Sequence, residues 1–365
     1  MIPFSHRKGV FTLKEKSAKP PKSVIILSVI LAGLVVTLAG LWLPRLLPPN
    51  SFECTNYAMG AYVQQTVYGS HAEEAASDAI REIMELENLI SWRIADSDIQ
   101  KLNDHAGVDW LTIDDATFSI LEQCLDVAEK SDGAFDPTIL PLSALWDFGG
   151  DNQHLPDAEQ IESSLQYVNY QNLRLDVEEG SASLKYHYMG IDLGAVGKGA
   201  ACTAAVQAYK DAGADAGIIA VGGSVGVFGT KPDGRLWNIA VRDPESGDDK
   251  TQALGSLDLD SGFVSTSGSY ERNFVENGVE YHHLLNPKTG YPADTGLVSV
   301  TVVHSDGTLS DALSTACFVL GVEKGTALLA LYGAEGIFID KDHGITVTDG
   351  LKDRFHLVSE NYHLL

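Results

Sequence analysis

The feature that most constrains this chain is a run of twenty consecutive uncharged residues at positions 24–43, most of them apolar. As a helix rising about 1.5 Å per residue, this run would span roughly 30 Å, the thickness of the hydrocarbon core of a membrane. Six basic residues precede the run, and one follows it before residue 50. Because positive flanks tend to stay in the cytoplasm, the asymmetry predicts a cytoplasmic tail at residues 1–23 and a body outside the membrane.

The run has other interpretations. A buried core helix would rarely be apolar on every face. A cleaved signal peptide is the main alternative, but the run is long for one, and residues 44–49 lack a small-x-small cleavage pattern. The stretch Ser51-Phe52-Glu53-Cys54 does not resemble a lipobox. We therefore expect an uncleaved single-pass signal anchor at 24–43, a Pro-rich linker at 44–54 and an extracytoplasmic domain at 55–365.

The body is strongly acidic. The first 50 residues hold seven of the 25 basic residues and one of the 50 acidic residues, which leaves 18 basic and 49 acidic residues after them. Such a body would repel a phosphate backbone, so a nucleic-acid-binding function is excluded. A small anionic ligand would need a metal ion or local backbone donors to offset this field.

The four cysteines form no CxxC pair, and no histidines accompany them at zinc-site spacing. We expect them to be small buried apolar side chains, with a single disulfide as the alternative if the body is exported. They are Cys54, Cys124, Cys202 and Cys317.

The hydrophobic periodicity after residue 55 predicts a mixture of helices and strands without a regular βαβ alternation, so we expect an α+β fold. The expected helices are 71–93, 114–130, 200–212, 309–320 and 323–332. The expected strands are 57–68, 172–176, 183–187, 217–221, 236–242, 254–259, 262–266 and 298–303, with a final pair near 335–348. An irregular loop with two prolines is expected at 135–141.

Four segments contain more Gly, Asp, Thr and His than packing requires. In the first, residues 191–199, three glycines within six residues precede a helix, whose N-terminal amides could bind an anion. Lys198 could add a point charge for a phosphate. The spacing matches neither GxGxxG nor a P-loop, so an ordinary strand-to-helix turn remains the alternative. The second segment, 221–229, is either a tight turn or a backbone wall beside a ligand.

The third segment joins the hydroxyl-rich residues 265–272 to His282, His283 and the turn 286–290. Its hydroxyls could bind phosphate or ribose, and a histidine could transfer a proton. In the fourth segment, Asp311 and Thr315 are four residues apart and would share one helix face. A carboxylate and a hydroxyl suit a hard cation such as Mg²⁺, but an acid near the helix start with a buried threonine is the alternative.

Taken together, these segments resemble the ApbE family of flavin transferases. The resemblance covers about residues 55–345 through eight collinear motifs. The motifs are Ala58-Met59-Gly60; Ser97-Asp98-Ile99 with Leu102-Asn103; 133–138 with Pro141-Leu142 and Leu145-Trp146; 192–199; Val221-Gly222-Gly223; 266–270; His283 with 286–290; and 311–315.

The resemblance implies an extracytoplasmic Mg²⁺-dependent enzyme that splits FAD, attaches FMN through a phosphoester to a Ser or Thr of a target flavoprotein, and releases AMP. It suggests a membrane redox subunit as the acceptor. The implied metal ligands are the carbonyl of Ala195 and the side chains of Asp311 and Thr315. His283 and Asp311 are the implied catalytic residues. The implied FAD contacts are Met59, Trp92, Trp146, Asp147, Phe148, Asp192, Lys198, Leu285 and Ser314.

The sequence also departs from the family pattern, at Ala61, Thr203, Ser224 and Asn286. None of these departures removes an implied metal ligand. Two other functions remain open from the sequence: an Mg²⁺-dependent FAD pyrophosphatase that releases free FMN and AMP, and a protein that holds FAD without splitting it. Retention of Lys198, Asp311 and Thr315 argues against the second.

Overall fold

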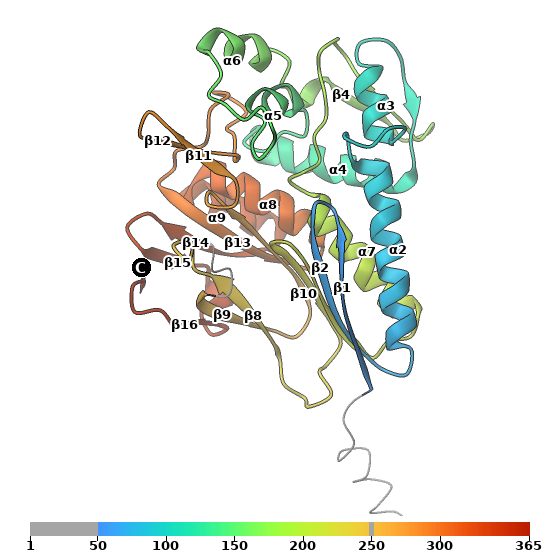
Figure 1. The fold of residues 1–365 in the computed structure, drawn as a ribbon, viewed down its shortest axis with the longest axis vertical. Helices are drawn as coiled ribbons and strands as arrows, with labels where there is room; N and C mark the ends of the chain where they lie inside the picture. Colours follow the sequence, from blue (N-terminus) through green and yellow to red (C-terminus); the bar gives the residue numbers. More distant parts are fainter. Residues whose placement is uncertain (1–49, 248–251) are drawn as a thin grey trace, which may run out of the picture. The chain divides into compact units, whose positions relative to one another are not determined.

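A nine-stranded sheet forms the centre of the protein, seen in a computed structural model that describes residues 50–247 and 252–365 (Figure 1). The strand order is β1-β2-β6-β7-β10-β13-β14-β15-β17, antiparallel except for the parallel pair β15–β17. The strands are β1 (Ser51–Ala58), β2 (Ala61–Tyr68), β6 (Ala216–Val221), β7 (Ser224–Phe228), β10 (Gly262–Gly268), β13 (Leu297–His304), β14 (Glu335–Asp340), β15 (Gly344–Val347) and β17 (His363–Leu364).

Four helices cover one face of this sheet: α2 packs on β1 and β2, α7 on β6 and β7, α8 on β10 and β13, and α9 on β14. They are α2 (Ala72–Ile90), α7 (Gly197–Asp211), α8 (Gly307–Leu320) and α9 (Val322–Tyr332). Helix α8 is buried on nearly all sides, which fits its mostly apolar composition. Its first turn is capped by Asp306, whose side chain accepts a hydrogen bond from the Leu309 amide at 2.9 Å.

A small antiparallel sheet, β16-β9-β8, packs on the opposite face of the large sheet. Its strands are β8 (Trp237–Arg242), β9 (Ala253–Leu259) and β16 (Phe355–Leu357). Trp237 and Leu257 are buried against apolar side chains of the large sheet, including Val264 and Ile337. The large sheet is therefore sandwiched between helices and a second sheet over much of its width.

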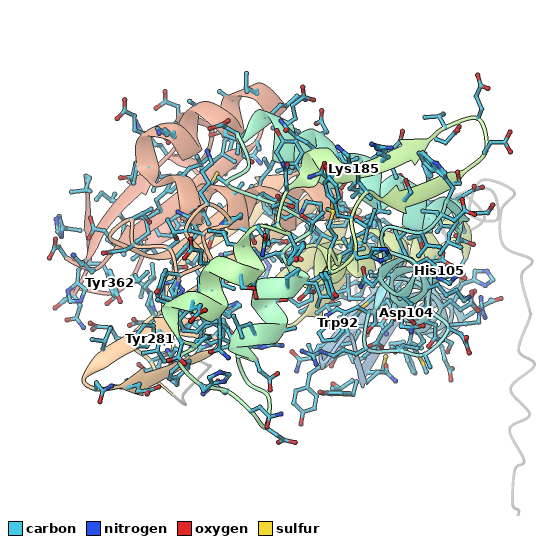
Figure 2. The ribbon with its side chains drawn as sticks, turned by 90° about the horizontal axis from the view of Figure 1, so that it is seen from above. Trp92, Asp104, His105, Lys185, Tyr281 and Tyr362 are labelled. Atoms are coloured by element: carbon cyan, nitrogen blue, oxygen red, sulfur yellow. The ribbon has the colours of Figure 1, made fainter. Side chains whose placement is uncertain are left out.

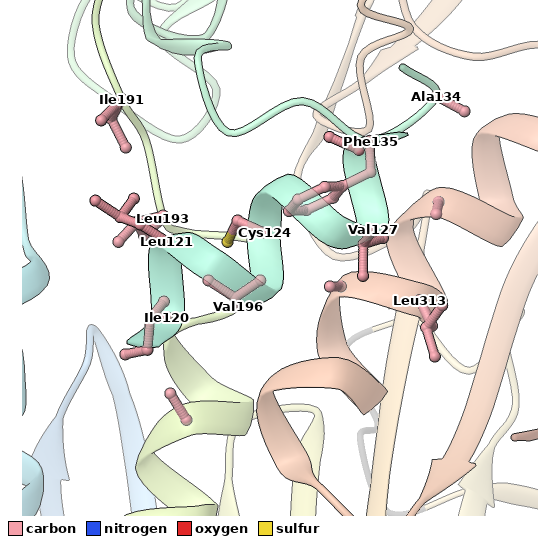
Figure 3. Close-up of a cluster of buried hydrophobic side chains, with 14 of the residues drawn as sticks. Ile120, Leu121, Cys124, Val127, Ala134, Phe135, Ile191, Leu193, Val196 and Leu313 are labelled. Carbon is pink, nitrogen blue, oxygen red and sulfur yellow. The ribbon is translucent and has the colours of Figure 1, made fainter. Parts of the chain in front are cut away.

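The remaining elements gather at one end of the molecule (Figure 1). They are α3 (Asp98–Asp104), β3 (Leu111–Thr112), α4 (Asp115–Lys130), α5 (Leu140–Trp146), α6 (Ala158–Leu165), β4 (Leu173–Asp176), β5 (Ser181–Leu184), β11 (Asn273–Glu276) and β12 (Val279–His282), with a short 3-10 turn at Tyr170–Asn172. A second 3-10 turn, Asp349–Leu351, packs against β14 instead. Figure 3 shows how α4 fixes the segment before α7: Leu121 and Cys124 of α4 are buried in one cluster with Leu193, Val196 and Leu313. This apolar contact holds the glycine-rich segment 191–199 close to α8.

The mixed helices and strands confirm the expected α+β class, and the expected helices correspond to α2, α4, α7, α8 and α9. The single strand expected at 57–68 is wrong, because the chain forms a hairpin, β1–β2. Its two turn residues, Met59 and Gly60, have φ of 54° and 65°, the left-handed geometry of a tight two-residue hairpin turn. Alternation of apolar residues continues through so short a turn, so the pattern does not reveal it.

Other expectations also need correction. Ser51 to Cys54 lie in β1, so the folded body starts inside the expected linker 44–54. Helix α5 occupies part of the segment expected to be an irregular loop, with a proline in its first turn, where the missing amide costs nothing. The glycine-rich segment 221–229 contains the tight turn that was one of its two interpretations, at Gly222 and Gly223 between β6 and β7, and it also contains the strand β7.

The apolar run 24–43 lies outside the described residues. Within 50–247 and 252–365, no helix is long and apolar enough to cross a membrane. All four cysteines are free, and three of them are buried as expected, while Cys54 is half-buried.

Candidate functional site

The centre of the site is Asp311, a carboxylate on α8 that is 3% exposed. Its Oδ2 accepts a hydrogen bond from the backbone amide of Gly199 at 2.9 Å. Burial raises the pKa of this carboxyl, while the charge of Lys198, the Gly199 amide and the Ser224 hydroxyl act in the opposite direction. A cation bound beside Asp311 would offset the cost of burying its negative charge.

Helices α7 and α8 cross at two glycines beside this carboxylate. A Cβ atom on Gly199 would overlap the carbonyl oxygen of Gly307, and one on Gly307 would overlap the carbonyl of Gly199. Gly199 is therefore needed for close helix packing, and this packing brings its amide to Asp311. The explanation of the glycine as a ligand-approach residue is not supported at this position.

Lys198 supplies a positive charge beside Asp311. Its Nζ lies 3.4 Å from the carbonyl oxygen of Gly194. A Cβ atom on Gly222 would lie 3.3 Å from Cδ of Lys198 and 3.4 Å from Cβ of Ala61. The turns β1–β2 and β6–β7 thus meet the start of α7 beside Lys198.

Two of the amides that were expected to be free for an anion at the start of α7 are already paired. The amide of Gly197 donates to the carbonyl of Leu193 at 2.9 Å, and that of Gly199 donates to Asp311. With these donors already paired, the Lys198 side chain is the main group that could bind a phosphate here.

Hydroxyl groups of β10, α8 and β7 form hydrogen bonds with one another close to Asp311. Ser267 Oγ lies 2.7 Å from Ser314 Oγ and 3.1 Å from Thr315 Oγ1. Ser265 Oγ donates to Ser224 Oγ at 3.1 Å. Because side chains alternate along a strand, Ser265 and Ser267 point to the same face of the sheet, toward α8. Asp311 and Thr315 are one turn apart on α8, as their spacing predicts.

His283 lies just after β12 and is held by the backbone of Arg272. Its amide donates to the Arg272 carbonyl at 3.1 Å, and its Nδ1 lies 3.3 Å from the same oxygen. Since a carbonyl only accepts, we assign the ring proton to Nδ1, which leaves the Nε2 lone pair free. Burial, followed by the charges of Arg272, Lys198 and His282, lowers the pKa of His283 to about 3. His283 is therefore neutral near pH 7.

The implied FAD contacts near α5 form a compact aromatic cluster. Trp146 is fully buried, stacks on Phe148 with ring centroids 5.3 Å apart, and shares an apolar cluster with Leu285. Its Nε1–H donates to the carbonyl of Gly290 at 2.9 Å. With no exposed surface, the Trp146 ring cannot stack on a ligand in this structure. It supports the turn 286–290 instead.

Asp147 follows Trp146 in a left-handed conformation, with φ of 46°, and its Oδ2 accepts the amide of Asn152 at 3.0 Å. Asp192 holds the start of the glycine-rich segment, because its carboxylate accepts from Ser143 Oγ at 2.8 Å and from the Gly194 amide at 2.9 Å. Both side chains are half-buried, so a ligand could reach them.

Two further implied contacts lie on other elements. Met59 is in the β1–β2 turn and packs against the core. The guanidinium carbon of Arg93 lies 4.1 Å from the centre of the Trp92 ring, so one face of that ring is covered. Figure 2 shows Trp92 well separated from Tyr281, which packs on Trp146. The structure does not bring Trp92 next to the Trp146 cluster.

The oxygen ligands that the family resemblance implies are of the kind that suits a hard cation. The candidate set is the Asp311 carboxylate, the Thr315 hydroxyl and the Ala195 carbonyl, which accepts no hydrogen bond from any described residue. Oxygen donors of this kind suit Mg²⁺, which keeps several waters and binds one or two carboxylates. The described part of the chain has no group of three or more His, Cys, Asp or Glu at metal distance. A set with one carboxylate would not produce such a group.

Four residues of the site lie in segments that the sequence analysis singled out, but it gave them no individual role: Ser224, Ser265, Ser267 and Arg272. A signal for the serines was present, because 265–267 are three consecutive hydroxyl residues in a strand that begins with apolar ones. Their partners lie on other elements, up to 48 residues away, so spacing alone does not identify them.

Known proteins are similar to this chain over most of its length. The family model described as the ApbE family matches residues 59–338. The FAD:protein FMN transferase of Treponema pallidum (strain Nichols) is 33% identical over 322 residues, 83% of this chain and 88% of that protein. The FAD:protein FMN transferase of Klebsiella pneumoniae (strain 342) is 32% identical, over 84% of this chain and 95% of that protein.

Solved structures agree with these relatives. The crystal structure of the ApbE protein from Thermotoga maritima superposes with a TM-score of 0.76 at 34% identity, over 82% of this chain and 98% of that one. The apo form of the flavinyl transferase ApbE from Pseudomonas stutzeri gives a TM-score of 0.75 at 27% identity, over 86% and 99% of the two chains.

Proposed function

The chain belongs to the ApbE family, and from this premise we propose that it is an FAD:protein FMN transferase. It splits FAD, attaches the FMN half through a phosphoester to a Ser or Thr hydroxyl of an acceptor protein, and releases AMP. The observation that carries this proposal is the convergence of Asp311, Thr315, Lys198 and His283, contributed by α8, α7 and the segment after β12.

These residues would have separate roles in cleaving the pyrophosphate. Asp311, Thr315 and the Ala195 carbonyl would hold Mg²⁺, which supplies neutralisation of charge on the phosphates. Lys198 adds a second positive charge beside the same phosphates. The Gly199 amide and the Ser224 hydroxyl already hydrogen-bond the Asp311 carboxylate, which favours a ligand role over proton transfer for this residue.

His283 is the residue that would accept the proton of the incoming hydroxyl. Its free Nε2 lone pair is available, and the Arg272 carbonyl fixes the ring. The acceptor oxygen bonds to the FMN phosphorus, the bond from that phosphorus to the bridging oxygen breaks, and AMP leaves with that oxygen. The anionic pyrophosphate would offset the positive charges of Arg272 and Lys198, and so raise the pKa of His283 from its low value in the free enzyme.

Transfer and hydrolysis differ only in whether a protein hydroxyl or water attacks the phosphorus. A positioned hydroxyl can have an effective molarity of about 10⁵ M or more, far above the concentration of water. Transfer therefore dominates when an acceptor is bound, and slow hydrolysis occurs without it.

The test is to incubate the body with FAD, Mg²⁺ and a candidate flavoprotein of the same cell, and to weigh the flavoprotein by mass spectrometry. We expect a mass increase of one FMN on a Ser or Thr, stable to unfolding, with AMP released in equal amount. If every exported flavoprotein of the cell leaves AMP release unchanged and free FMN is always the product, the enzyme is an FAD pyrophosphatase instead.

We further propose that the chain is a single-pass membrane protein with this domain outside the cytoplasm. The six-to-one asymmetry of basic residues around 24–43 supports that orientation. The acceptor would then be a membrane redox subunit exposed on the same face. Protease added to intact spheroplasts should remove the body, and survival of the body until lysis would contradict this orientation.

A further inference from the structure

The hydroxyl groups between β10 and α8 form a chain whose donors can be assigned. Ser314 Oγ donates to the backbone carbonyl of Asp311 at 2.8 Å, and a carbonyl has no hydrogen to give. The one hydroxyl hydrogen of Ser314 is therefore used. In the 2.7 Å contact between Ser267 and Ser314, Ser267 must be the donor.

The same accounting fixes the next contact. Ser267 has one hydroxyl hydrogen, and Ser314 accepts it. In the 3.1 Å contact between Ser267 and Thr315, Thr315 must then donate. The hydrogen of Thr315 points to β10, and both of its oxygen lone pairs are left for another partner. That is the orientation that a cation ligand requires.

We propose that Ser267 is a positioning residue, which turns the Thr315 hydroxyl so that its lone pairs, and not its hydrogen, face the cation. The inference rests on the proposed function, because it deepens the assignment of Thr315 as a ligand. Ser267 touches neither the cation nor the substrate; it acts through Thr315.

A second chain of hydroxyl groups leads to Asp311, the other side-chain ligand of the proposed cation site. Ser265 donates to Ser224, its partner across the β7–β10 pair, and the Ser224 hydroxyl hydrogen-bonds Asp311. Strand β10 thus sends one hydroxyl chain to each of the two side-chain ligands. Buried hydroxyls without such partners would carry a cost, so each chain also satisfies its own polar groups.

If the Ser267 hydroxyl is removed, the Thr315 hydroxyl should donate its hydrogen bond to another acceptor. A threonine in a helix readily donates to the carbonyl four residues before it, here Asp311, by changing its side-chain rotamer. That rotation moves the oxygen away from its position beside Ser267. Groups that orient metal ligands typically contribute about 10- to 100-fold to metal affinity.

The experiment is a titration of the FAD-loaded protein with Mg²⁺ in the absence of acceptor, and calorimetry measures the Mg²⁺ affinity. We expect Ser267→Ala to weaken Mg²⁺ binding about tenfold. Ser267→Cys keeps nearly the same volume with a poor hydrogen-bonding group, and should weaken binding similarly if the alanine variant is unstable. The matched control is Ser310→Ala, which also removes a buried serine hydroxyl from α8. Ser310 Oγ donates to the Val302 carbonyl at 2.9 Å and is not part of either series of hydroxyl groups.

A double-mutant cycle separates positioning from general destabilisation. In a Thr315→Val background, Ser267→Ala should have little further effect on Mg²⁺ affinity, because its effect acts through Thr315. Unchanged affinity in both Ser267 variants, an equal loss in the Thr315→Val background, or a wild-type protein that binds no Mg²⁺ would each overturn the inference. A wild-type protein that binds Mg²⁺ but transfers no FMN would contradict the proposed function and leave this inference standing.

Discussion

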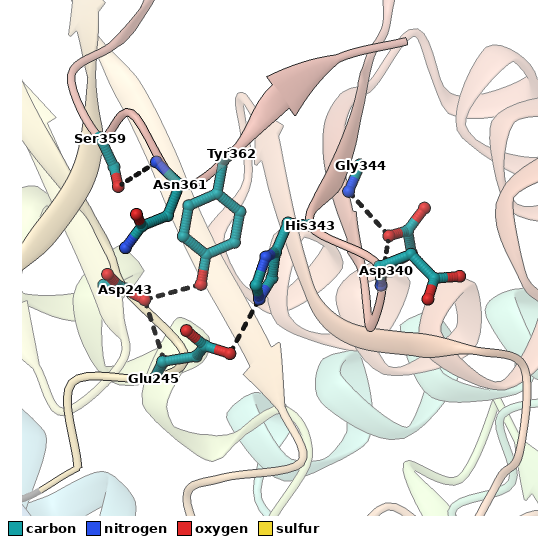
Figure 4. A network of polar contacts seen from close by, with 9 residues as sticks. Asp243, Glu245, Asp340, His343, Gly344, Ser359, Asn361 and Tyr362 are labelled. Atoms are coloured by element: carbon teal, nitrogen blue, oxygen red, sulfur yellow. Dashed lines mark hydrogen bonds and ion pairs between the residues drawn. The ribbon is translucent and has the colours of Figure 1, made fainter.

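Two polar clusters in this protein use similar residue types in opposite environments. The reaction-centre cluster is Asp311, Lys198 and His283. The peripheral cluster, shown in Figure 4, is Asp243, Glu245, His343 and Tyr362. In the peripheral cluster, His343 Nε2 lies 2.8 Å from Glu245 Oε1, and the Tyr362 hydroxyl donates to Asp243 Oδ1 at 2.7 Å.

The two histidines shift in opposite directions. The hydrogen bond to Glu245 raises the pKa of His343, whereas burial lowers the pKa of His283 to about 3. The side chains of His343 and Glu245 are 38% and 59% exposed, so water and salt screen their attraction. Asp311 lies in the interior, where charges interact strongly and a cation is strongly favoured. The burial of Asp311, and not residue type, distinguishes the reaction-centre cluster from the peripheral one.

The largest effect is expected at the carboxylate of the buried cluster. Asp311→Ala should abolish FMN transfer, with a loss of about a thousandfold or more, because Mg²⁺ loses its only anionic protein ligand beside the phosphates. Turnover is measured by AMP release, and circular dichroism checks that the variant remains folded. Wild-type turnover of this variant in Mg²⁺ would refute the assignment.

A smaller loss is expected at the neutral ligand. Thr315→Val keeps the shape of the side chain but removes its oxygen, and should lower Mg²⁺ affinity about tenfold. The midpoint of the Mg²⁺ dependence of transfer measures this shift. A midpoint equal to that of the wild type would remove Thr315 from the ligand set.

The two histidines should contribute to the pH dependence of stability with opposite signs. The folded pKa of His283 is below its unfolded value near 6.5, so the unfolded chain binds the proton first as pH falls. Its contribution to stability is present above about pH 6.5 and is lost as pH falls toward 3. In His283→Gln, melting temperature should therefore fall less between pH 7 and pH 4 than in the wild type. An identical pH dependence would show that His283 is not kept neutral.

The smallest effect is expected in the peripheral cluster. The folded pKa of His343 is raised, so its contribution is present below about pH 6.5 and is lost as pH rises through the folded value. Glu245→Gln should leave FMN transfer unchanged and alter the melting temperature less than His283→Gln does. A clear loss of transfer in Glu245→Gln would show that the peripheral cluster is part of the reaction site.

The sequence predicts the parts of this site that depend on local spacing. Asp311 and Thr315 share a helix face because they are four residues apart. Lys198 is recognised as a candidate because it lies within the glycine-rich segment 191–199. The hydroxyl chains were not predicted, because Ser267 meets Thr315 only when β10 packs on α8. From the sequence alone, Gly199 is expected to allow close approach of a ligand. Its contact with Gly307 cannot be predicted, because it depends on how α7 crosses α8. Trp146 has an aromatic ring suited to stacking, but only the packed cluster shows that this ring is buried.

The most direct test of the account is a single turnover of FAD, Mg²⁺ and acceptor protein in water enriched in oxygen-18. Attack by the acceptor hydroxyl on the FMN phosphorus places no water oxygen in either product. We therefore predict unlabelled AMP and an acceptor that carries unlabelled FMN. Labelled free FMN as the main product, or label in AMP, would contradict the account, because water would then be the nucleophile.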